Sequence, residues 1–246
     1  MCTMLVDRGT LKRLLDHTYL EVIPAPSILE RLACLPRNAY LSITCSPRHG
    51  LEPTLKLVEQ IQSLPQDRLI RPVPHIAARL VRDRGHLEEV LARLREAQVK
   101  CIFVPAGDPS TPVGIYDDSL MMLRDMAEIG HSMEDVGVAA HPEGHPFLSD
   151  QELLRFLKEK QRFATYMVTQ MCFDPNAIIG WLRDIRNAGV TLPTWIGLPG
   201  VADVTRLISV SLRIGVGQSV RFLKKQTGLL RKLIGAKSYQ PDSLLG

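Results

Sequence analysis

Polar side chains that can carry chemistry recur where short apolar runs of the 246-residue chain end. They are three acids, three histidines, a threonine and a glutamine: Glu21, Thr44, His75, Asp108, His141, Glu143, His145 and Gln170. Carboxyl and imidazole groups can transfer protons, whereas hydroxyl and amide groups hold ligands. Glu21 stands inside an apolar run, where its burial would cost several kcal/mol unless it were paired or protonated. We therefore expect Glu21 to be functional, although a lone histidine, threonine or glutamine at such a place is more often structural.

The same residues could form other kinds of site, but their spacing disfavours these. His141 and His145 are four residues apart, yet they flank residues 142–144 and a further proline follows at 146. That pattern is typical of a loop and not of the helix of an HExxH zinc motif. A Ser-His-Asp hydrolase is also disfavoured, because the chain has no GxSxG turn. We expect no metal.

Seven apolar runs predict strands, at residues 19–24, 39–44, 71–77, 100–107, 136–142, 166–173 and 193–200. Helical patterns lie between them, and residues 86–98 place Leu87, Val90, Leu91 and Leu94 on one face. Three more helices are indicated by acidic starts or caps and by terminal glycines, at residues 117–130, 150–160 and 174–189. Asp174 or Asn176 is the expected N-cap of the last one, and Gly189 follows its end.

A strand-helix-strand repeat of about 30 residues indicates parallel βαβ units. The alternatives are a doubly wound sheet and a closed barrel, and the absence of GxGxxG disfavours a dinucleotide-binding Rossmann domain. Because polar residues follow several different strands, we favour an α/β fold of the (β/α)8 barrel type.

The eighth strand of such a barrel is missing from the pattern, since two helical stretches and a loop-like tail follow Gly200. Either the barrel is open or the chain stops before its last strand. We expect one domain over residues 1–246. The basic amphipathic stretch at 215–235 fits a barrel helix better than a membrane-surface helix, and "GVGQS" at 215–219 is a weak candidate for a phosphate site.

The composition suits a globular protein, with 45% hydrophobic and 23% charged residues. No apolar run is long enough to span a bilayer, and the N-terminus lacks the pattern of a signal peptide, so we expect a cytoplasmic protein without a membrane partner. The net charge of +4 fits an anionic ligand such as a nucleotide and does not require nucleic acid. A homo-oligomer is compatible with the sequence, which does not fix the oligomeric state.

Seven short segments carry a resemblance: "LEVIPAPS" (20–27), "LSIT" (41–44), "PHIA" (74–77), "AGDPS" (106–110), "AAHPEGHP" (139–146), "VTQMCFD" (168–174) and "GLPG" (197–200). In this order they resemble the methylenetetrahydrofolate reductase family, whose members are (β/α)8 barrels that reduce 5,10-methylenetetrahydrofolate to 5-methyltetrahydrofolate. The segment 139–146 is close to the family's Ala-x-Tyr-Pro-Glu-x-His-Pro and is the most specific of the seven.

The resemblance implies a role for each matching residue. Glu21 would be the general acid that opens the five-membered ring of the folate, Asp108 would stabilise the resulting cation, and Gln170 would bind the pterin. The positions that contact the cofactor would be Thr44, His75, Gly107, Tyr116, His141, His145 and Lys160.

The chain departs from the family at several flavin contacts. Ala106 stands where the family has arginine, His141 replaces the tyrosine, and three helix positions are apolar or acidic: Leu153, Phe156 and Glu159. Each lost polar contact removes about 1–3 kcal/mol of binding. The chain is thus similar to the flavin-independent subgroup, in which NADH or NADPH passes hydride directly to the folate, and we expect FAD to be absent or weakly bound.

Three alternatives remain open at this point. The chain could be a conventional FAD-dependent reductase, or a folate- or nucleotide-binding barrel without catalysis. It could also be a folate-dependent methyltransferase that works with a corrinoid partner, which the lack of a Cys/His zinc pattern disfavours.

Overall fold

The computed structural model describes residues 7, 9, 17–65, 69–108, 111–172 and 174–198. These residues divide into two compact units. The N-terminal unit holds the described residues up to Val138 together with residues 163–165, and the C-terminal unit holds residues 139–162 and the described residues from Tyr166 onward. A single domain over residues 1–246 stays a prediction.

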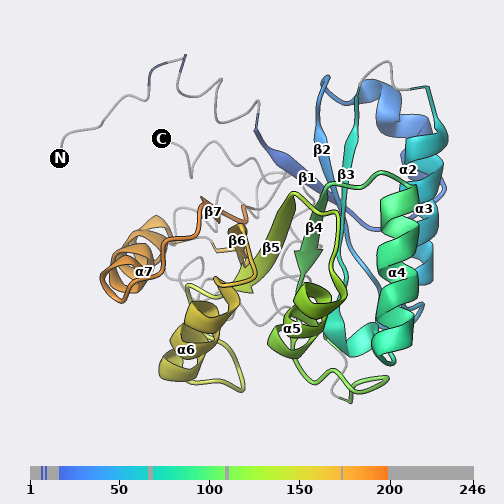
Figure 1. Ribbon diagram of the computed structural model, residues 1–246. Coiled ribbons are helices and arrows are strands. Elements are labelled where there is room, and N and C mark those ends of the chain that lie inside the picture. Colours follow the sequence, from blue (N-terminus) through green and yellow to red (C-terminus); the bar gives the residue numbers. More distant parts are fainter. Residues whose placement is uncertain are drawn as a thin grey trace. The chain divides into compact units, whose positions relative to one another are not determined.

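Parallel strands form the centre of the N-terminal unit (Figure 1). In sheet order they are β1 (Tyr19–Val22), β2 (Tyr40–Ile43) and β3 (Arg71–Pro74), followed along the chain by the pair β4 (Cys101–Val104) and β5 (Asp135–Ala140). The last two residues of β5 belong to the C-terminal unit. A parallel bridge joins His75, just after β3, to Phe103 of β4. Apolar side chains such as Ile43, Val73 and Ile102 are completely buried, which is why these runs form strands.

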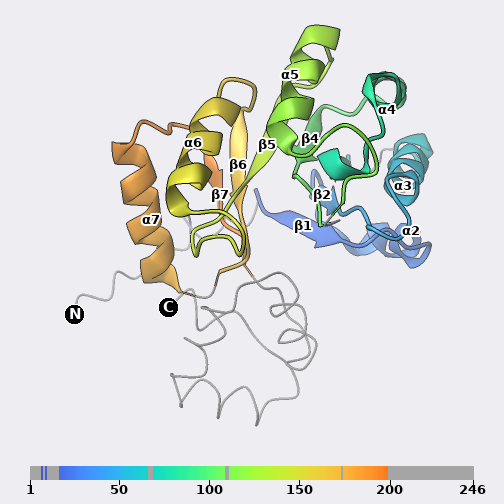
Figure 2. The ribbon, with the colours of Figure 1, turned by 90° about the horizontal axis from the view of Figure 1, so that it is seen from below.

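Three long helices lie in a row outside these strands, as Figures 1 and 2 show for α3 (Glu52–Ser63), α4 (Arg84–Glu96) and α5 (Ser119–Ile129). Asp83 and Asp118 cap α4 and α5 by accepting hydrogen bonds from main-chain N–H groups of the first turn. Gly130 ends α5 at a φ of 81°, a conformation that favours glycine. A short helix α2 (Ser27–Arg31) follows β1, and two 3-10 turns lie at Leu32–Cys34 and Ala78–Leu80.

The C-terminal unit continues the alternation with α6 (Asp150–Lys160), β6 (Tyr166–Thr169), α7 (Pro175–Asn187) and β7 (Thr194–Trp195). Strands β6 and β7 are parallel, and the two helices lie on one side of them (Figure 2). Ser149 and Glu152 form a capping box at the start of α6. The N-cap of α7 is Asp174, and Asn176, the other expected N-cap, lies within the first turn of the helix.

All seven predicted strands and the four predicted helices are present, and the alternating α/β class with parallel sheets is confirmed. The four apolar residues expected on one face of α4 are all buried: Leu87, Val90, Leu91 and Leu94. The helices expected after Gly200, the 215–235 segment and the question of an eighth strand lie outside the described residues, so barrel closure stays a prediction. Among the described residues, no helix is both long and apolar enough to cross a membrane.

Candidate active site

The carboxyl ends of β1, β2 and β3 meet at one edge of the N-terminal unit, and this edge holds three of the predicted residues. Thr44 extends β2 by donating its main-chain N–H to the carbonyl oxygen of Val22 at 2.9 Å. His75 extends β3 by donating its N–H to the carbonyl of Ile43, also at 2.9 Å. Glu21 lies directly across from Ser42 in the register of β1 and β2. Parallel strands therefore bring Glu21, Thr44 and His75 to the same edge.

Glu21 is less buried than the sequence led us to expect. Its side chain keeps 67% of its surface exposed, and its neighbour Leu20 is exposed too, so the prediction of a buried carboxylate is wrong. The reason is that β1 pairs with β2 through its main chain while the outer faces of Leu20 and Glu21 stay accessible. Nearby protein atoms still desolvate the carboxyl group and raise its pKa above the ordinary value. The role of Glu21 as a proton donor stays a prediction.

His75 is the buried partner of this carboxyl group. Its Nε2 lies 4.0 Å from Oε2 of Glu21 and 2.7 Å from the hydroxyl oxygen of Ser42. Burial of the imidazole lowers its pKa to about 4, so His75 is neutral near pH 7 and no ion pair with Glu21 forms. The ring of Phe103 packs edge-on against the imidazole at 4.7 Å between centroids.

Ser42 was not among the residues singled out from the sequence. Ser42 is a polar residue within the apolar run 39–44, just as Glu21 is within the run 19–24. The argument that a polar residue inside an apolar strand is functional would therefore have identified Ser42 too. Ser42, His75 and Glu21 do not form a hydrolase triad. In such a triad the acid and the nucleophile bind opposite ring nitrogens, whereas here both face Nε2.

Asp108 follows β4 and is exposed, and Gly107 before it has a φ of 101°, which favours glycine. Burial raises the pKa of the Cys45 thiol to about 11, and the negative charge of Asp108 contributes to this increase. Because Cys45 directly follows Thr44, this coupling places Asp108 near the carboxyl end of β2. Asp108 therefore belongs to the same edge as Glu21.

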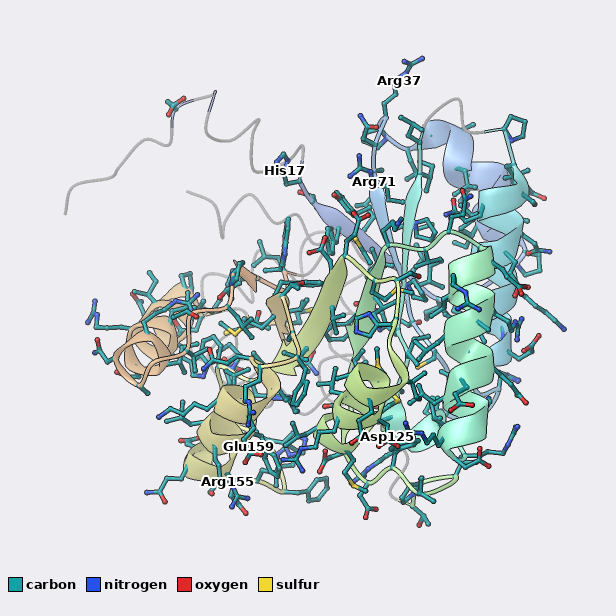
Figure 3. The ribbon with its side chains drawn as sticks, in the orientation of Figure 1. His17, Arg37, Arg71, Asp125, Arg155 and Glu159 are labelled. Atoms are coloured by element: carbon teal, nitrogen blue, oxygen red, sulfur yellow. The ribbon has the colours of Figure 1, made fainter. Side chains whose placement is uncertain are left out.

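Tyr116 has a packing role in this structure. Its ring is almost fully buried, and its hydroxyl group donates a 2.6 Å hydrogen bond to Asp125 of α5. Figure 3 labels Asp125 on the side of α5 that faces α4, where Arg84 also lies 3.7 Å from it. The predicted contact between Tyr116 and a cofactor stays a prediction, and it would have to involve a group other than the engaged hydroxyl.

The C-terminal unit gathers a second set of predicted residues around the loop after β5. The rings of His141 and His145 meet edge to face at 5.1 Å. Burial first, and then the charges of His145 and Lys160, lower the pKa of His141 to about 4. The main-chain N–H of Gln170, which follows β6, donates to the carbonyl of Ala140 at 2.7 Å. His141, His145, Lys160 and Gln170 are thus neighbours within this unit.

One further contact holds this loop in place. The thiol of Cys172 lies 3.3 Å from Oε1 of Glu143, and Gly144 turns the chain with a φ of 80°. The side-chain oxygen of Gln170 accepts from the N–H of Met171, which turns its amide group toward its own main chain. Over the described part of the chain, no three His, Cys, Asp or Glu side chains come together in a way that would hold a metal ion.

This geometry defines a class of protein: an alternating α/β domain with parallel strands whose carboxyl ends present a raised-pKa carboxyl group, a neutral histidine and an exposed aspartate. Such an edge is where α/β enzymes place their ligands.

Comparison with known proteins identifies the family to which this α/β chain belongs. The family model described as "Methylenetetrahydrofolate reductase" matches residues 25–217. Methylenetetrahydrofolate reductase 2 of Saccharomyces cerevisiae is 32% identical over 87 residues, which cover 34% of this chain and 14% of that protein. Methylenetetrahydrofolate reductase 1 of Schizosaccharomyces pombe is 37% identical over 65 residues, or 26% of this chain and 11% of that protein. The chain belongs to the methylenetetrahydrofolate reductase family, and its alignments span only a small share of these two relatives.

Proposed function

We propose that this protein is an oxidoreductase that reduces 5,10-methylenetetrahydrofolate to 5-methyltetrahydrofolate with hydride from NADH or NADPH. Membership of the reductase family supports the reaction class. The observation that carries the proposal is the Glu21 carboxyl group, whose pKa is raised and which stands beside a neutral histidine. A carboxyl group that keeps its proton nearer to neutral pH can act as a general acid.

In the proposed reaction, Glu21 donates its proton to a nitrogen of the five-membered folate ring. The carbon–nitrogen bond then breaks, its electron pair stays on the protonated nitrogen, and a methylene iminium cation forms on the other nitrogen. The exposed carboxylate of Asp108 would stabilise this cation electrostatically. The iminium carbon then accepts a hydride from the nicotinamide, which leaves a methyl group and NAD(P)+.

Gln170 would bind the pterin through its amide group. The side-chain oxygen of Gln170 is engaged by Met171, but its NH2 group meets no acceptor among the described residues. It could therefore donate to the pterin without losing an internal bond. His141, His145 and Lys160 would line the cofactor side of the same loop region, as the resemblance implies.

The residues expected to hold FAD fit that cofactor poorly in the N-terminal unit. The hydroxyl of Thr44 donates to Val22, the hydroxyl of Tyr116 donates to Asp125, and Nε2 of His75 faces Ser42. A flavin that used these groups would have to replace internal hydrogen bonds, each of which contributes about 1 kcal/mol. This supports hydride transfer directly from the nicotinamide, without FAD.

The first test is anaerobic oxidation of NADH by the purified protein with methylenetetrahydrofolate and without added flavin. Folate-dependent oxidation supports both the reductase and direct transfer. Oxidation only after addition of FAD would make the protein a conventional flavoenzyme. No oxidation in either assay, together with tight folate binding, would favour a folate-binding protein without catalysis.

Glu21→Gln then tests the proton donor. Loss of the general acid should lower kcat by at least about 100-fold while folate binding is nearly unchanged. Glu30→Gln, on the exposed side of the short helix α2, is the matched control and should leave kcat unaltered. Wild-type turnover by the Glu21 variant would rule out the mechanism.

A further inference from the structure

Ser42 occupies a place in the site that the proposed reaction does not use. It lies in the middle of β2, opposite Glu21 on one side and Val73 on the other, and only 7% of its surface is exposed. Its hydroxyl oxygen is 2.7 Å from Nε2 of His75. The same nitrogen lies 4.0 Å from the Glu21 carboxyl group. One ring nitrogen thus has two polar neighbours, and its protonation decides how it interacts with each.

The hydroxyl group of Ser42 has one hydrogen-bond partner in the part of the chain that the structure describes, and that partner is Nε2 of His75. If Nε2 carried a proton, it would donate to the serine oxygen, and the buried hydroxyl proton would be left without an acceptor there. If Nε2 carries none, the hydroxyl group donates to it and is satisfied. Buried donors without acceptors are rare because they cost about 1–3 kcal/mol. Nδ1 of His75 is not among the buried side-chain atoms that lack a partner in the described part of the chain, so a proton on Nδ1 is not left unsatisfied. The contact therefore favours the tautomer of His75 with its proton on Nδ1.

This choice of tautomer affects Glu21. An Nε2–H group could turn its hydrogen bond to the ionised carboxylate and stabilise the charged form. An unprotonated Nε2 has only a lone pair, which accepts from Ser42, so it offers no hydrogen to the Glu21 carboxylate and does not stabilise its charged form. Holding the proton on Nδ1 thus favours the form of Glu21 that can donate a proton to the substrate.

We propose that Ser42 is a positioning residue, which fixes the tautomer of His75 and thereby keeps the neighbouring Glu21 carboxyl group protonated. The proposal rests on the proposed function, because it explains how Glu21 is kept ready as the proton donor. Ser42 is buried, and its hydroxyl group acts through His75.

The other titratable groups at this edge do not account for the effect. Cys45 after β2 is a neutral thiol, since its pKa is raised to about 11. Asp108 after β4 is an exposed carboxylate, and Thr44 directs its hydroxyl group to Val22. His75 is the group whose ring nitrogen reaches the Glu21 carboxyl group. The tautomer of His75 is therefore the variable to test.

The test compares Ser42→Ala with wild type by NMR, with ¹⁵N shifts of the His75 ring and a ¹³C titration of the Glu21 carboxyl carbon. In wild type the proton is expected on Nδ1. In the variant it moves to Nε2 and the pKa of Glu21 falls by about 1, the size typical of a gained hydrogen bond to the charged form. A wild-type proton on Nε2, or an unchanged Glu21 titration in Ser42→Ala, overturns the proposal.

Kinetics give a second readout. At pH values above both pKa values, kcat of Ser42→Ala should be about tenfold lower, because a fall of 1 in pKa reduces the protonated fraction tenfold. Below them kcat should match wild type, and KM should change little. Ser42→Thr keeps the hydroxyl group and should restore the wild-type pH profile, whereas a loss of activity that is the same at every pH would mean a structural role.

Ser119→Ala is the matched control, because it removes a buried hydroxyl group that has no hydrogen-bond partner among the described residues. It should change neither the titration of Glu21 nor the pH profile. If wild type reduces no folate, the proposed function fails while the NMR experiment still decides the role of Ser42. If wild type is active and the titrations are equal, only the role of Ser42 fails.

Discussion

His75 should make the stability of this protein depend on acidity. Its pKa is lowered by burial from 6.5 to about 4, and the residue is only 8% exposed, so the environment is little screened by solvent. The unfolded chain binds the proton at higher pH than the folded chain does, so stability is full above pH 6.5 and falls as the pH drops toward 4. One pKa unit corresponds to about 1.4 kcal/mol, so the loss amounts to about 3 kcal/mol.

The assay is urea unfolding at several pH values between 7 and 4, for wild type and for His75→Gln. Glutamine can still accept a hydrogen bond from Ser42 but does not titrate. Between pH 7 and pH 4 the free energy of unfolding of the variant should therefore fall by about 3 kcal/mol less than that of wild type. His49→Gln removes an exposed histidine of the same unit and should follow the wild-type curve. Parallel curves for wild type and His75→Gln would refute the assignment of a buried, neutral His75.

Further predictions concern the elements that hold the site. Gly114→Ala should destabilise the protein by at least about 2 kcal/mol in thermal or urea unfolding, because the new methyl group would collide with the main chain of Arg82. Gly180→Ala, in open space on α7, should instead stabilise it by about 0.5–1 kcal/mol; destabilisation there would contradict the helix assignment. Asp118→Ala removes the N-cap of α5 and should lower the free energy of unfolding by about 1 kcal/mol. Leu94→Ala opens a cavity beneath α4 and should lower it by about 2–5 kcal/mol, and a smaller loss in urea unfolding would mean that the core collapses around the gap.

The seven strands and the helices α4 to α7 could be predicted because each has a local cause, whereas α2 and α3 were not predicted. Residues 84–96 form a helix because four leucine and valine side chains recur at helical spacing. Asp118 and Gly130 mark the two ends of α5 by their hydrogen bonding and backbone freedom. The apolar runs form parallel strands because each is long enough for one strand and helices lie between successive runs. The chain's family was also predictable, since its short motifs keep their order.

The surroundings of particular side chains were not predictable in the same way. Glu21 stands in an apolar run, which suggested burial, but the faces of Leu20 and Glu21 remain accessible. Tyr116 matched a cofactor contact, yet its hydroxyl group is held by Asp125, nine residues further along the chain. Ser42 was not predicted as a site residue, and its place in the site follows only from its contact with His75 in the folded chain.

The sequence by itself determined which segments become the seven strands and the helices α4 to α7, and that Glu21, Thr44, His75 and Asp108 follow or lie within strands. These properties depend on periodicity, capping and chain order, which are local. Only the tertiary structure decided that Nε2 of His75 faces Ser42 and Glu21 together, and that burial holds this histidine neutral. A pKa and a tautomer depend on atoms brought within a few ångströms by strand pairing, and residues 33 positions apart in the chain, such as Ser42 and His75, become neighbours only when the sheet forms.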